Sequence, residues 1–362
     1  MAPDAPDFSR LHRALVVKLR HHGDVLLTSP VFTALRAHAP HLEIDALVYD
    51  DTSDMLALHP ALDRLHVIGR RWRGASVVQH ALAEWRLWRS LRARRYDLIV
   101  HLTSHPRGAW LARTLGAAVS VAPRKAGRWW GASFTHQYPV IGSGRRHTVE
   151  IHLDALRRIG VQPAVETRAL VLEPGEAARA EVDRRLHESD LRPGGFVHFH
   201  PASRWRFKCW PAAAAARLID ELHRHGHRVV ITAAPSAAER ALVLSIVGQC
   251  TIPPLDWSGS LGLKEMAALS ARAALFVGAD SAPMHIAAAM NTPTVALFGP
   301  SGESEWGPWM VRHRVVASTE HSCRPCGLDG CGGGKRSDCL EQLPVQRVLS
   351  AALELLDASD ER

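Results

Sequence analysis

Apolar residues fall in short runs separated by longer amphipathic stretches, and this alternation occurs twice along the chain. In the first half, the short runs have the length and composition of strands and the stretches between them have the periodicity of helices. The predicted strands are Ala14–Leu19, Ile44–Tyr49, Leu65–Ile68 and Asp97–Leu102, and the predicted helices are Asp24–His38, Ser76–Arg94 and His147–Ile159. This order predicts a parallel sheet with helices on both faces.

The pattern restarts after a segment rich in proline and glycine, between about residues 160 and 195. The second set comprises strands Phe196–His200, Arg228–Ala233, Ala274–Val277 and Thr294–Phe298, and helices Pro211–His225, Ala237–Gly248, Lys264–Ala273, Ala282–Met290 and Val345–Leu356. A chain of 362 residues also exceeds the usual size of one hydrophobic core. We therefore predict an α/β protein of two facing Rossmann-like domains, 1–175 and 176–362, with ligands at the carboxyl ends of the strands.

The loop after the first predicted strand is Arg20-His21-His22-Gly23-Asp24. Gly23 permits a tight turn, and Asp24 stands where the following helix is predicted to begin. One interpretation is that Asp24 only caps that helix. Two histidines and an arginine in the same loop favour the other interpretation, in which the loop belongs to a site.

The loop after strand Phe196–His200 holds a hydroxyl, Ser203, and three cations that end with Lys208. Pro211 suits the first turn of the next helix. Cations beside the amino end of a helix favour an anion site, most naturally for phosphate. The alternative is that the arginines are solvated and Trp210 belongs to the core.

A third loop, Gly278-Ala-Asp-Ser-Ala-Pro-Met-His285, opens the helix that continues to Met290. Asp280 or Ser281 could simply cap that helix. However, free N–H groups at Ser281 and Ala282 would suit a diphosphate. His285 lies one turn along and could face the same site, although a single histidine in a helix is more often structural.

Four of the six cysteines are crowded near the carboxyl end, at Cys323, Cys326, Cys331 and Cys339. Four thiolates could hold a structural zinc ion, but the last two spacings do not match a common zinc knuckle. The alternative is a glycine-rich loop with reduced cysteines, as expected in a reducing compartment.

Positive charge is concentrated in the first domain. The formal net charge of +8 suits an anionic partner: nucleic acid, a membrane surface or a phosphorylated substrate. Between Arg70 and Arg95 eight arginines stand against the single acid Glu84. Tryptophans accompany this stretch and the later cations Arg124, Lys125 and Arg128; they are Trp72, Trp85, Trp88, Trp129 and Trp130. Such a surface fits the headgroup layer of an anionic membrane, or else the tryptophans pack inward from a solvated helix.

The sequence lacks the features typical of membrane-spanning proteins, secreted proteins and dinucleotide-dependent dehydrogenases. No apolar run approaches the roughly 20 residues that a membrane-spanning helix needs, and the start of the chain has no apolar segment typical of a secretory signal. No G-x-G-x-x-G follows the first predicted strand, which argues against a dinucleotide-dependent dehydrogenase. These features favour a cytoplasmic protein.

Taken together, the loops resemble glycosyltransferase family 9, the ADP-heptose:lipopolysaccharide heptosyltransferases. The similar segments are Lys18-Leu-Arg-His-His-Gly-Asp-Val-Leu-Leu-Thr-Ser-Pro30, Lys208-Cys-Trp-Pro211, Gly278-Ala-Asp-Ser-Ala-Pro-Met-His285, Leu297-Phe-Gly-Pro300 and Trp306-Gly-Pro308. Their order and spacing span most of the chain. The His-His-Gly-Asp loop and Pro325-Cys-Gly-Leu-Asp-Gly-Cys-Gly-Gly-Gly-Lys335 look most like the heptosyltransferase III branch, which adds the branching heptose of the inner core.

The resemblance implies a GT-B fold with an acceptor-binding domain, 1–175, and a nucleotide-sugar-binding domain, 176–362. It implies ADP-heptose as donor, inversion at the anomeric carbon and no required cofactor. Asp24 matches the family's proposed general base and Lys208 the lysine that stabilises the departing diphosphate. The implied donor-binding residues are Ser203, Asp280, Ser281, Ala282 and His285, and the acceptor-side loop comprises Arg20, His21, His22 and Gly23.

The resemblance also implies a location and a partner. The acceptor would be the lipopolysaccharide inner core, so the enzyme would be peripheral to the cytoplasmic face of the inner membrane, near an anionic surface and without nucleic acid. Two alternatives stay open: another GT-B activity, such as transfer of a different sugar or epimerisation, and a basic protein that binds RNA or DNA.

The sequence departs from the family pattern at two places. Relatives often carry an acidic residue after the strand ending at Ala233, where this chain has Ala234-Pro235-Ser236. Pro283 replaces a residue that is commonly more flexible or polar. Both departures concern nucleotide recognition and leave the predicted fold unchanged.

Overall fold

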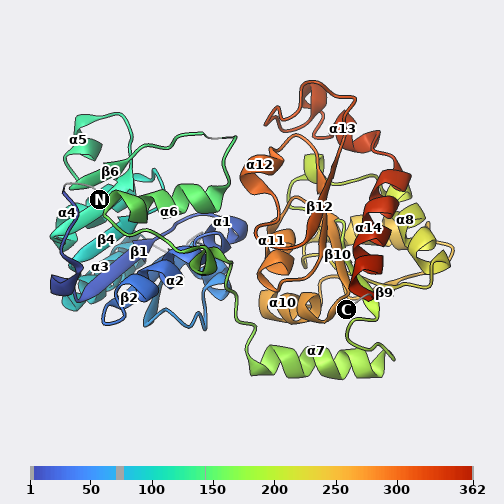
Figure 1. The fold of residues 1–362 in the computed structure, drawn as a ribbon, viewed down its shortest axis with the longest axis horizontal. Helices are drawn as coiled ribbons and strands as arrows, with labels where there is room; N and C mark the ends of the chain where they lie inside the picture. Colours follow the sequence, from blue (N-terminus) through green and yellow to red (C-terminus); the bar gives the residue numbers. More distant parts are fainter. Residues whose placement is uncertain (1–3, 71–76, 143, 361–362) are drawn as a thin grey trace. The chain divides into compact units, whose positions relative to one another are not determined.

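The computed structural model describes residues 4–70, 77–142 and 144–360. The chain divides into two compact units, Met1–Leu172 and Glu173–Arg362 (Figure 1). In the described residues each unit is built around one six-stranded sheet in which every neighbouring pair is parallel. The prediction of an α/β protein with two parallel sheets is therefore confirmed.

The sheet of the first unit has the strand order β3-β2-β1-β4-β5-β6. The strands are β1 (Arg13–Val17), β2 (Glu43–Tyr49), β3 (Arg64–Ile68), β4 (Leu98–His101), β5 (Val119–Pro123) and β6 (His136–Tyr138). The chain builds outward from β1 to β3 and then returns to place β4 on the other side of β1. The loops after β1 and β4 therefore diverge, and in open parallel sheets ligands bind at such a switch point.

Helices cover both faces of this sheet. They are α1 (His22–Leu26), α2 (Ser29–His38), α3 (Val77–Arg94), α4 (Pro106–Leu115), α5 (Arg128–Gly131) and α6 (Thr148–Arg158), with 3-10 turns η1 (Phe8–Arg10), η2 (Asp50–Met55) and η3 (Val165–Arg168). On one face, Leu15 and Val17 of β1 pack with Leu91 of α3 and Leu111 of α4. On the other face α2 packs against α6.

The sheet of the second unit has the order β12-β11-β10-β7-β8-β9, so its switch point lies between β7 and β10. The strands are β7 (Phe196–His200), β8 (Arg228–Ile231), β9 (Leu255–Asp256), β10 (Leu275–Ala279), β11 (Thr294–Phe298) and β12 (His313–Ala317). Figure 1 shows this sheet between two helical layers. The helices and turns are α7 (Glu176–Glu188), α8 (Ala212–Arg224), α9 (Ala237–Val247), α10 (Leu263–Arg272), α11 (Ala282–Ala289), α12 (Glu303–Trp306), α13 (Asp338–Glu341), α14 (Val345–Asp360), η4 (Arg206–Lys208) and η5 (Cys331–Gly333).

The predicted helix Asp24–His38 is wrong as a single element, because the chain forms α1 and α2 with a break at Leu27 and Thr28. Pro30 lacks the N–H that would continue the hydrogen-bond ladder back to Leu26. In addition, the Thr28 hydroxyl donates to the carbonyl of Val25 at 2.6 Å, a local bond that competes with a continuous helix.

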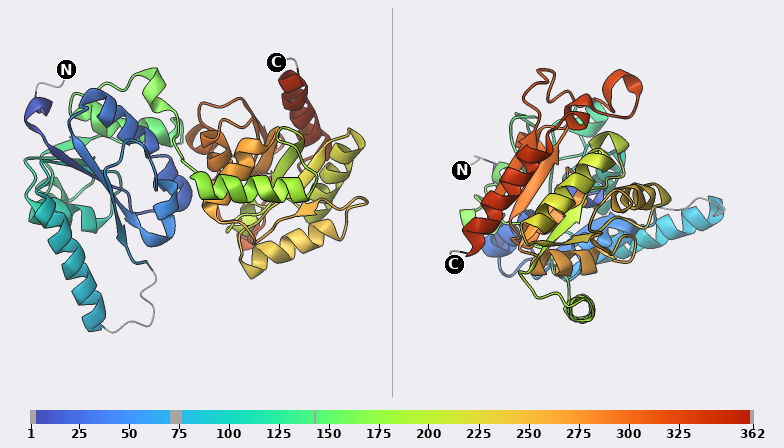
Figure 2. Two further views of the ribbon diagram at one scale, coloured as in Figure 1. Left: turned by 90° about the horizontal axis from the view of Figure 1, so that it is seen from below. Right: turned by 90° about the vertical axis from the view of Figure 1, so that its right-hand side faces the viewer.

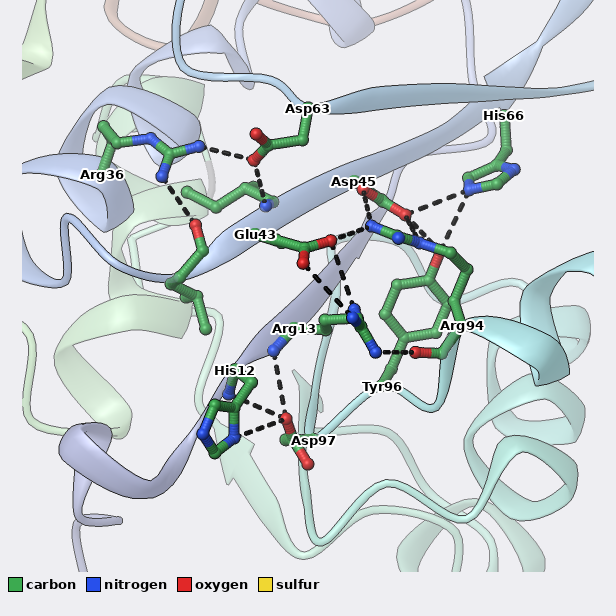
Figure 3. A network of polar contacts seen from close by, with 12 residues as sticks. His12, Arg13, Arg36, Glu43, Asp45, Asp63, His66, Arg94, Tyr96 and Asp97 are labelled. Atoms are coloured by element: carbon green, nitrogen blue, oxygen red, sulfur yellow. Dashed lines mark hydrogen bonds and ion pairs between the residues drawn. The ribbon is translucent and has the colours of Figure 1, made fainter.

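A polar network ties the end of α3 to the amino end of the first sheet (Figure 3). The carboxylate of Asp45, buried in β2, accepts hydrogen bonds from Arg94 (2.9 Å), Tyr96 (2.7 Å) and His66 (3.2 Å). Burial by itself raises the pKa of Asp45, but these hydrogen bonds outweigh it and lower the pKa to about 2. Arg94 also binds Glu43 at 2.6 Å, so the last turn of α3 is held by two carboxylates.

The opposite end of α3 extends away from the rest of the first unit (Figure 2). Its 18 residues span about 27 Å at 1.5 Å per residue, whereas the four residues of β4 span about 13 Å. Because α3 runs back from the end of β3 to the start of β4, the excess length lies at the carboxyl edge of the sheet. No helix in the described part of the chain is both long and apolar enough to cross a membrane.

Candidate active site

The first candidate site lies where β1 and β4 diverge. Lys18 directly follows β1, and its ammonium lies 3.2 Å from the carbonyl of Leu102, after β4, and 2.7 Å from Nε2 of His152 in α6. One carboxylate oxygen of Asp24, in the first turn of α1, lies 3.9 Å from Lys18 Nζ and 3.5 Å from Arg20 Nε. The fold thus places a carboxylate beside two cations at the edge where ligands bind in sheets of this topology.

The surroundings give Lys18 and Asp24 different properties. Lys18 is buried, and burial lowers its pKa to about 8 although the charge of Asp24 opposes this shift. Its ammonium is therefore mainly charged at neutral pH. The Asp24 side chain is 14% exposed, so it remains in part accessible to solvent beside its two cationic neighbours.

The predicted start of the helix at Asp24, after a tight turn at Gly23, is wrong. The backbone of His21 is extended and forms the N-cap, and α1 begins at His22, so Gly23 and Asp24 are both helical. Asp24 therefore pairs with cations from within the first turn instead of serving as the N-cap. Of the other residues in this loop, Arg20 has a largely exposed side chain, whereas His21 and His22 are half-buried.

Neither Lys18 nor His152 was predicted as a functional residue of this site. Lys18 at least begins a segment that resembles the family, which leaves His152. It lies on the buried face of α6 with Val149, Leu153 and Leu156. A histidine on an otherwise apolar face was the only available signal, and such a histidine is more often structural. Its link to Lys18, 134 positions earlier, follows from packing that the sequence pattern does not specify.

The second candidate site lies at the switch point of the other sheet, where His200 of β7 is opposite Gly278 of β10. A Cβ at Gly278 would lie 2.9 Å from the carbonyl oxygen of His200, so glycine permits this close approach. Lys208, in the turn after β7, donates a hydrogen bond of 2.6 Å to Asp280, which directly follows β10. The two predicted site residues are therefore in contact, although 72 positions separate them.

The amino end of α11 lies next to this ion pair. Ser281 is the N-cap, but its hydroxyl bonds to the carbonyl of Ala279 at 3.2 Å and makes no capping bond. The first N–H groups of a helix have no partner within it, so those at Ser281 and Ala282 suit an anion. Pro283 is compatible with this arrangement because the first turn needs no N–H from it. His285, one turn along, is buried.

Two interpretations of the loop after β7 were open: an anion site, or solvated arginines with Trp210 in the core. Each describes part of the loop. Trp210 is buried in the core and its indole donates to the carbonyl of Leu343 at 3.2 Å, while Arg204 and Arg206 are exposed. The Ser203 hydroxyl accepts a hydrogen bond from the N–H of Trp205 at 3.2 Å, which shapes the loop. Of the three cations in this loop, Lys208 forms the ion pair with Asp280.

A carboxylate does lie at the loop after β8, where the sequence lacks the family's acidic residue. Glu239, in the first turn of α9, is buried, and its Oε2 accepts a hydrogen bond from the N–H of Ala234 at 3.0 Å. Ser236 caps the same helix by accepting from the N–H of Glu239. This chain therefore has a carboxylate in contact with the loop after β8, supplied by a residue five positions after Ala234.

Two buried histidines of β7, His198 and His200, form a hydrogen-bond network next to the second site. The hydroxyl of Thr232, next after β8, lies 2.8 Å from Nε2 of His198 and 2.9 Å from Nδ1 of His200, while Nδ1 of His198 lies 3.0 Å from the hydroxyl of Ser270. Burial lowers the pKa of both histidines to about 3. They are therefore neutral, and the network fixes the end of β7 immediately before the Lys208 loop.

The cysteine-containing segment also reaches this site. The Ser337 hydroxyl donates to the carbonyl of Phe207 at 2.8 Å, and Arg324 donates to the carbonyl of Gly299 at 2.6 Å. The four cysteines of the segment are free: Cys323, Cys326, Cys331 and Cys339. In the described residues no three His, Cys, Asp or Glu side chains are grouped to hold a metal ion, so the zinc interpretation gains no support.

Comparison with known proteins identifies the family of this chain. Residues 84–334 match the profile of Glycosyltransferase family 9 (heptosyltransferase). The chain is 36% identical over 295 residues to lipopolysaccharide heptosyltransferase 3 of Escherichia coli, an alignment that covers 80% of this chain and 84% of that protein.

Solved structures of low sequence identity share the fold. A glycosyl transferase family 9 protein from Veillonella parvula superposes with a TM-score of 0.82 at 24% identity, covering 98% of each chain. The ADP-heptose lps heptosyltransferase II of E. coli superposes with a TM-score of 0.75 at 21% identity, covering 96% of this chain and 99% of that one. The chain has the GT-B fold and is a glycosyltransferase that belongs to glycosyltransferase family 9, the heptosyltransferases.

Proposed function

We propose that this enzyme transfers heptose from ADP-heptose to a heptose of the lipopolysaccharide inner core, as the branching residue. The contact between Lys208 and Asp280 carries the proposal, because it brings a cation next to the amino end of α11, and both features favour a diphosphate. The names of the relatives support heptose as the sugar. Residues 176–362 would bind the donor and residues 1–175 the acceptor.

Asp24 is the proposed general base. The acceptor hydroxyl oxygen attacks the anomeric carbon of the donor while its proton passes to the Asp24 carboxylate. The bond from that carbon to the β-phosphate oxygen breaks, and its electron pair leaves with ADP. Attack opposite the leaving group inverts the anomeric centre. Arg20, His21, His22 and Gly23 form the acceptor-side loop in this proposal.

Lys208 is the proposed stabiliser of the leaving diphosphate. Negative charge grows on the phosphate oxygens as ADP departs, and a fixed cation lowers the energy of that transition state. The other proposed donor contacts are Ser203, Asp280, Ser281, Ala282 and His285. Because lysine and helix N–H groups supply positive charge, the proposed reaction requires no cofactor.

Selective recognition of ADP is the first expected result. At a nucleotide concentration of about 100 Kd, binding stabilises the folded protein by roughly 2.7 kcal/mol, a rise in Tm of about 5–11 °C for a domain of this size. Thermal shift and calorimetry with ADP, UDP, GDP and NAD measure this preference. ADP-heptose and inner-core lipopolysaccharide lacking the branching heptose then test transfer by product analysis. Selective binding of UDP would instead indicate another GT-B activity and contradict the proposed donor.

We further propose that the enzyme works at the cytoplasmic face of the inner membrane, on an anionic lipid surface. Three tryptophans on helices of the first unit are exposed: Trp85 (51%), Trp110 (44%) and Trp129 (49%). On α3, Val78 and Leu82 are exposed on the same face as Trp85, with Arg86 and Arg89 beside them. Apolar and aromatic side chains flanked by arginine suit an anionic headgroup layer.

The inward-packing alternative holds for other tryptophans of this region. Trp130 is buried against Ala109, Ala112 and Phe134, and Trp88 is half-buried. Trp72 lies outside the described residues. The interpretation of this stretch as a membrane-facing surface therefore concerns Trp85 and Trp129, together with Trp110.

Vesicles containing phosphatidylglycerol are expected to retain the enzyme at low salt and release it at high salt, because exposed charges are screened over about 10 Å at 0.1 M. R86A/R89A should weaken retention. R217A/R347A removes the same charge from exposed positions on α8 and α14 of the second unit and should leave retention unchanged. Equal loss in both variants, or equal retention on neutral vesicles, would contradict the assigned surface.

A further inference from the structure

The hydrogen bonds of His152 fix its tautomer. Its Nδ1 lies 3.0 Å from the carbonyl oxygen of Leu27, which can only accept, so Nδ1 carries the proton. Burial, and next the charge of Lys18, place the pKa of His152 well below its ordinary value, and the ring is neutral. Its Nε2 therefore has a free lone pair, which accepts a hydrogen bond from the Lys18 ammonium at 2.7 Å.

Two neutral acceptors hold the Lys18 ammonium in a buried position. One is Nε2 of His152 and the other is the carbonyl of Leu102 at 3.2 Å. The third neighbour, Asp24, is 3.9 Å away, beyond hydrogen-bonding distance. A buried ammonium favours losing its proton unless acceptors replace its water, so His152 keeps this lysine charged.

The distance between the Lys18 ammonium and the Asp24 carboxylate affects the ability of Asp24 to accept a proton. A hydrogen bond from an ammonium to a carboxylate lowers the basicity of the carboxylate and occupies a lone pair. At 3.9 Å the lysine still attracts negative charge but leaves the carboxylate free to accept a proton from a hydroxyl. We propose that His152 is a positioning residue, which holds Lys18 charged yet withdrawn from Asp24. This inference rests on the proposed role of Asp24 as general base.

The charged and titratable groups around Lys18 come from several elements. Asp24 lies on α1 and Arg20 on the loop before it, His152 on α6 and His101 on β4. Burial lowers the pKa of His101 to about 3, so that ring stays neutral near pH 8. Activity should fall as pH rises through the Lys18 pKa, because an uncharged Lys18 no longer attracts the negative charge that grows on the acceptor oxygen as its proton leaves.

Replacement of His152 by leucine and by glutamine separates positioning from packing. Glutamine can accept from Lys18 through its carbonyl and donate to Leu27 through its amide, whereas leucine fills space and does neither. The chain has only five lysines, so lysine-selective 13Cε NMR can follow Lys18, assigned with K18M. We expect titration near pH 8 in the wild type, a value lower by about one pH unit in H152L, which is tenfold in the protonation equilibrium, and recovery in H152Q.

Turnover with ADP-heptose and the inner-core acceptor provides the second readout. The alkaline limb of the kcat profile should move to lower pH in H152L, by about the same one unit, and return in H152Q, while KM for the donor stays unchanged. A histidine with a purely structural role would lower Tm in H152L without moving either the NMR titration or the kcat limb. An unchanged Lys18 titration in folded H152L would overturn the inference.

The D24N variant separates this inference from the proposed function. If D24N keeps its turnover, the base assignment is wrong, and the positioning role fails with it even if NMR still couples His152 to Lys18. If D24N is inactive but the kcat limb of H152L coincides with that of the wild type, only the positioning role is wrong.

Discussion

Replacing Asp24 by asparagine is expected to lower kcat about a thousandfold, within the range of roughly 10²–10⁴ for loss of a general base. Asparagine has nearly the same size but cannot take the proton of the acceptor hydroxyl. Donor affinity should stay unchanged, since the residues proposed to bind ADP belong to the other unit. Steady-state kinetics with ADP-heptose, combined with calorimetry of ADP binding, measure both effects.

A matched control uses Asp54, an exposed carboxylate on η2, which packs against α1. D54N makes the same charge change close to the site and should retain wild-type turnover. Near-normal turnover of folded D24N would show that another group takes the proton. A comparable loss in D54N would instead indicate a general effect of charge.

Replacing Lys208 by methionine is expected to lower kcat by about 10²–10³, as for removal of one group that stabilises charge in a transition state. Methionine keeps most of the apolar stem and removes the cation. It also leaves Asp280 buried without its partner, which costs roughly 3–5 kcal/mol for a fully buried pair. We expect about 2–3 kcal/mol here, because the Lys208 side chain is 21% exposed.

The double variant K208M/D280N separates catalysis from stability. Removing the unpaired carboxylate should recover most of the lost stability in urea unfolding, while turnover stays low because the cation is still absent. Recovery of turnover together with stability would show that Lys208 serves only to neutralise Asp280. In that case the role of Lys208 toward the diphosphate would be wrong.

The alternating pattern was sufficient to predict two parallel sheets, because strands buried on both faces are continuous apolar runs and helices carry one apolar stripe. Strands β5, β6, β9 and β12, which lie toward the edges of the two sheets, were not predicted. Strands β2, β3 and β11 lie within a residue or two of their predicted ends. Lys208 and Asp280 could be predicted as site residues because both follow central strands of one sheet. The carboxyl ends of neighbouring parallel strands lie at the same edge of that sheet.

Features that depend on packing could not be predicted from the pattern. The break between α1 and α2 depends on Pro30 and on the local bond of Thr28, which outweigh an otherwise continuous helical periodicity. His152 and Glu239 lie on helices, and their partners are backbone or side-chain groups whose positions only the folded chain supplies. Conversely, Pro283 departs from the family pattern in sequence but fits the first turn of α11.

The excess length of α3 has a consequence for which sugars the enzyme can reach. Arg94 holds one end of the helix against the sheet, and the other end, which begins at Val77, extends away from the rest of the first unit, at the carboxyl edge of the sheet. In the membrane-bound enzyme proposed here, the part of α3 that extends beyond the sheet sets the distance between Asp24 and the lipid headgroups. Shortening α3 by whole turns would reduce that distance by about 5.4 Å per turn and would change which sugar of a membrane-anchored acceptor meets Asp24.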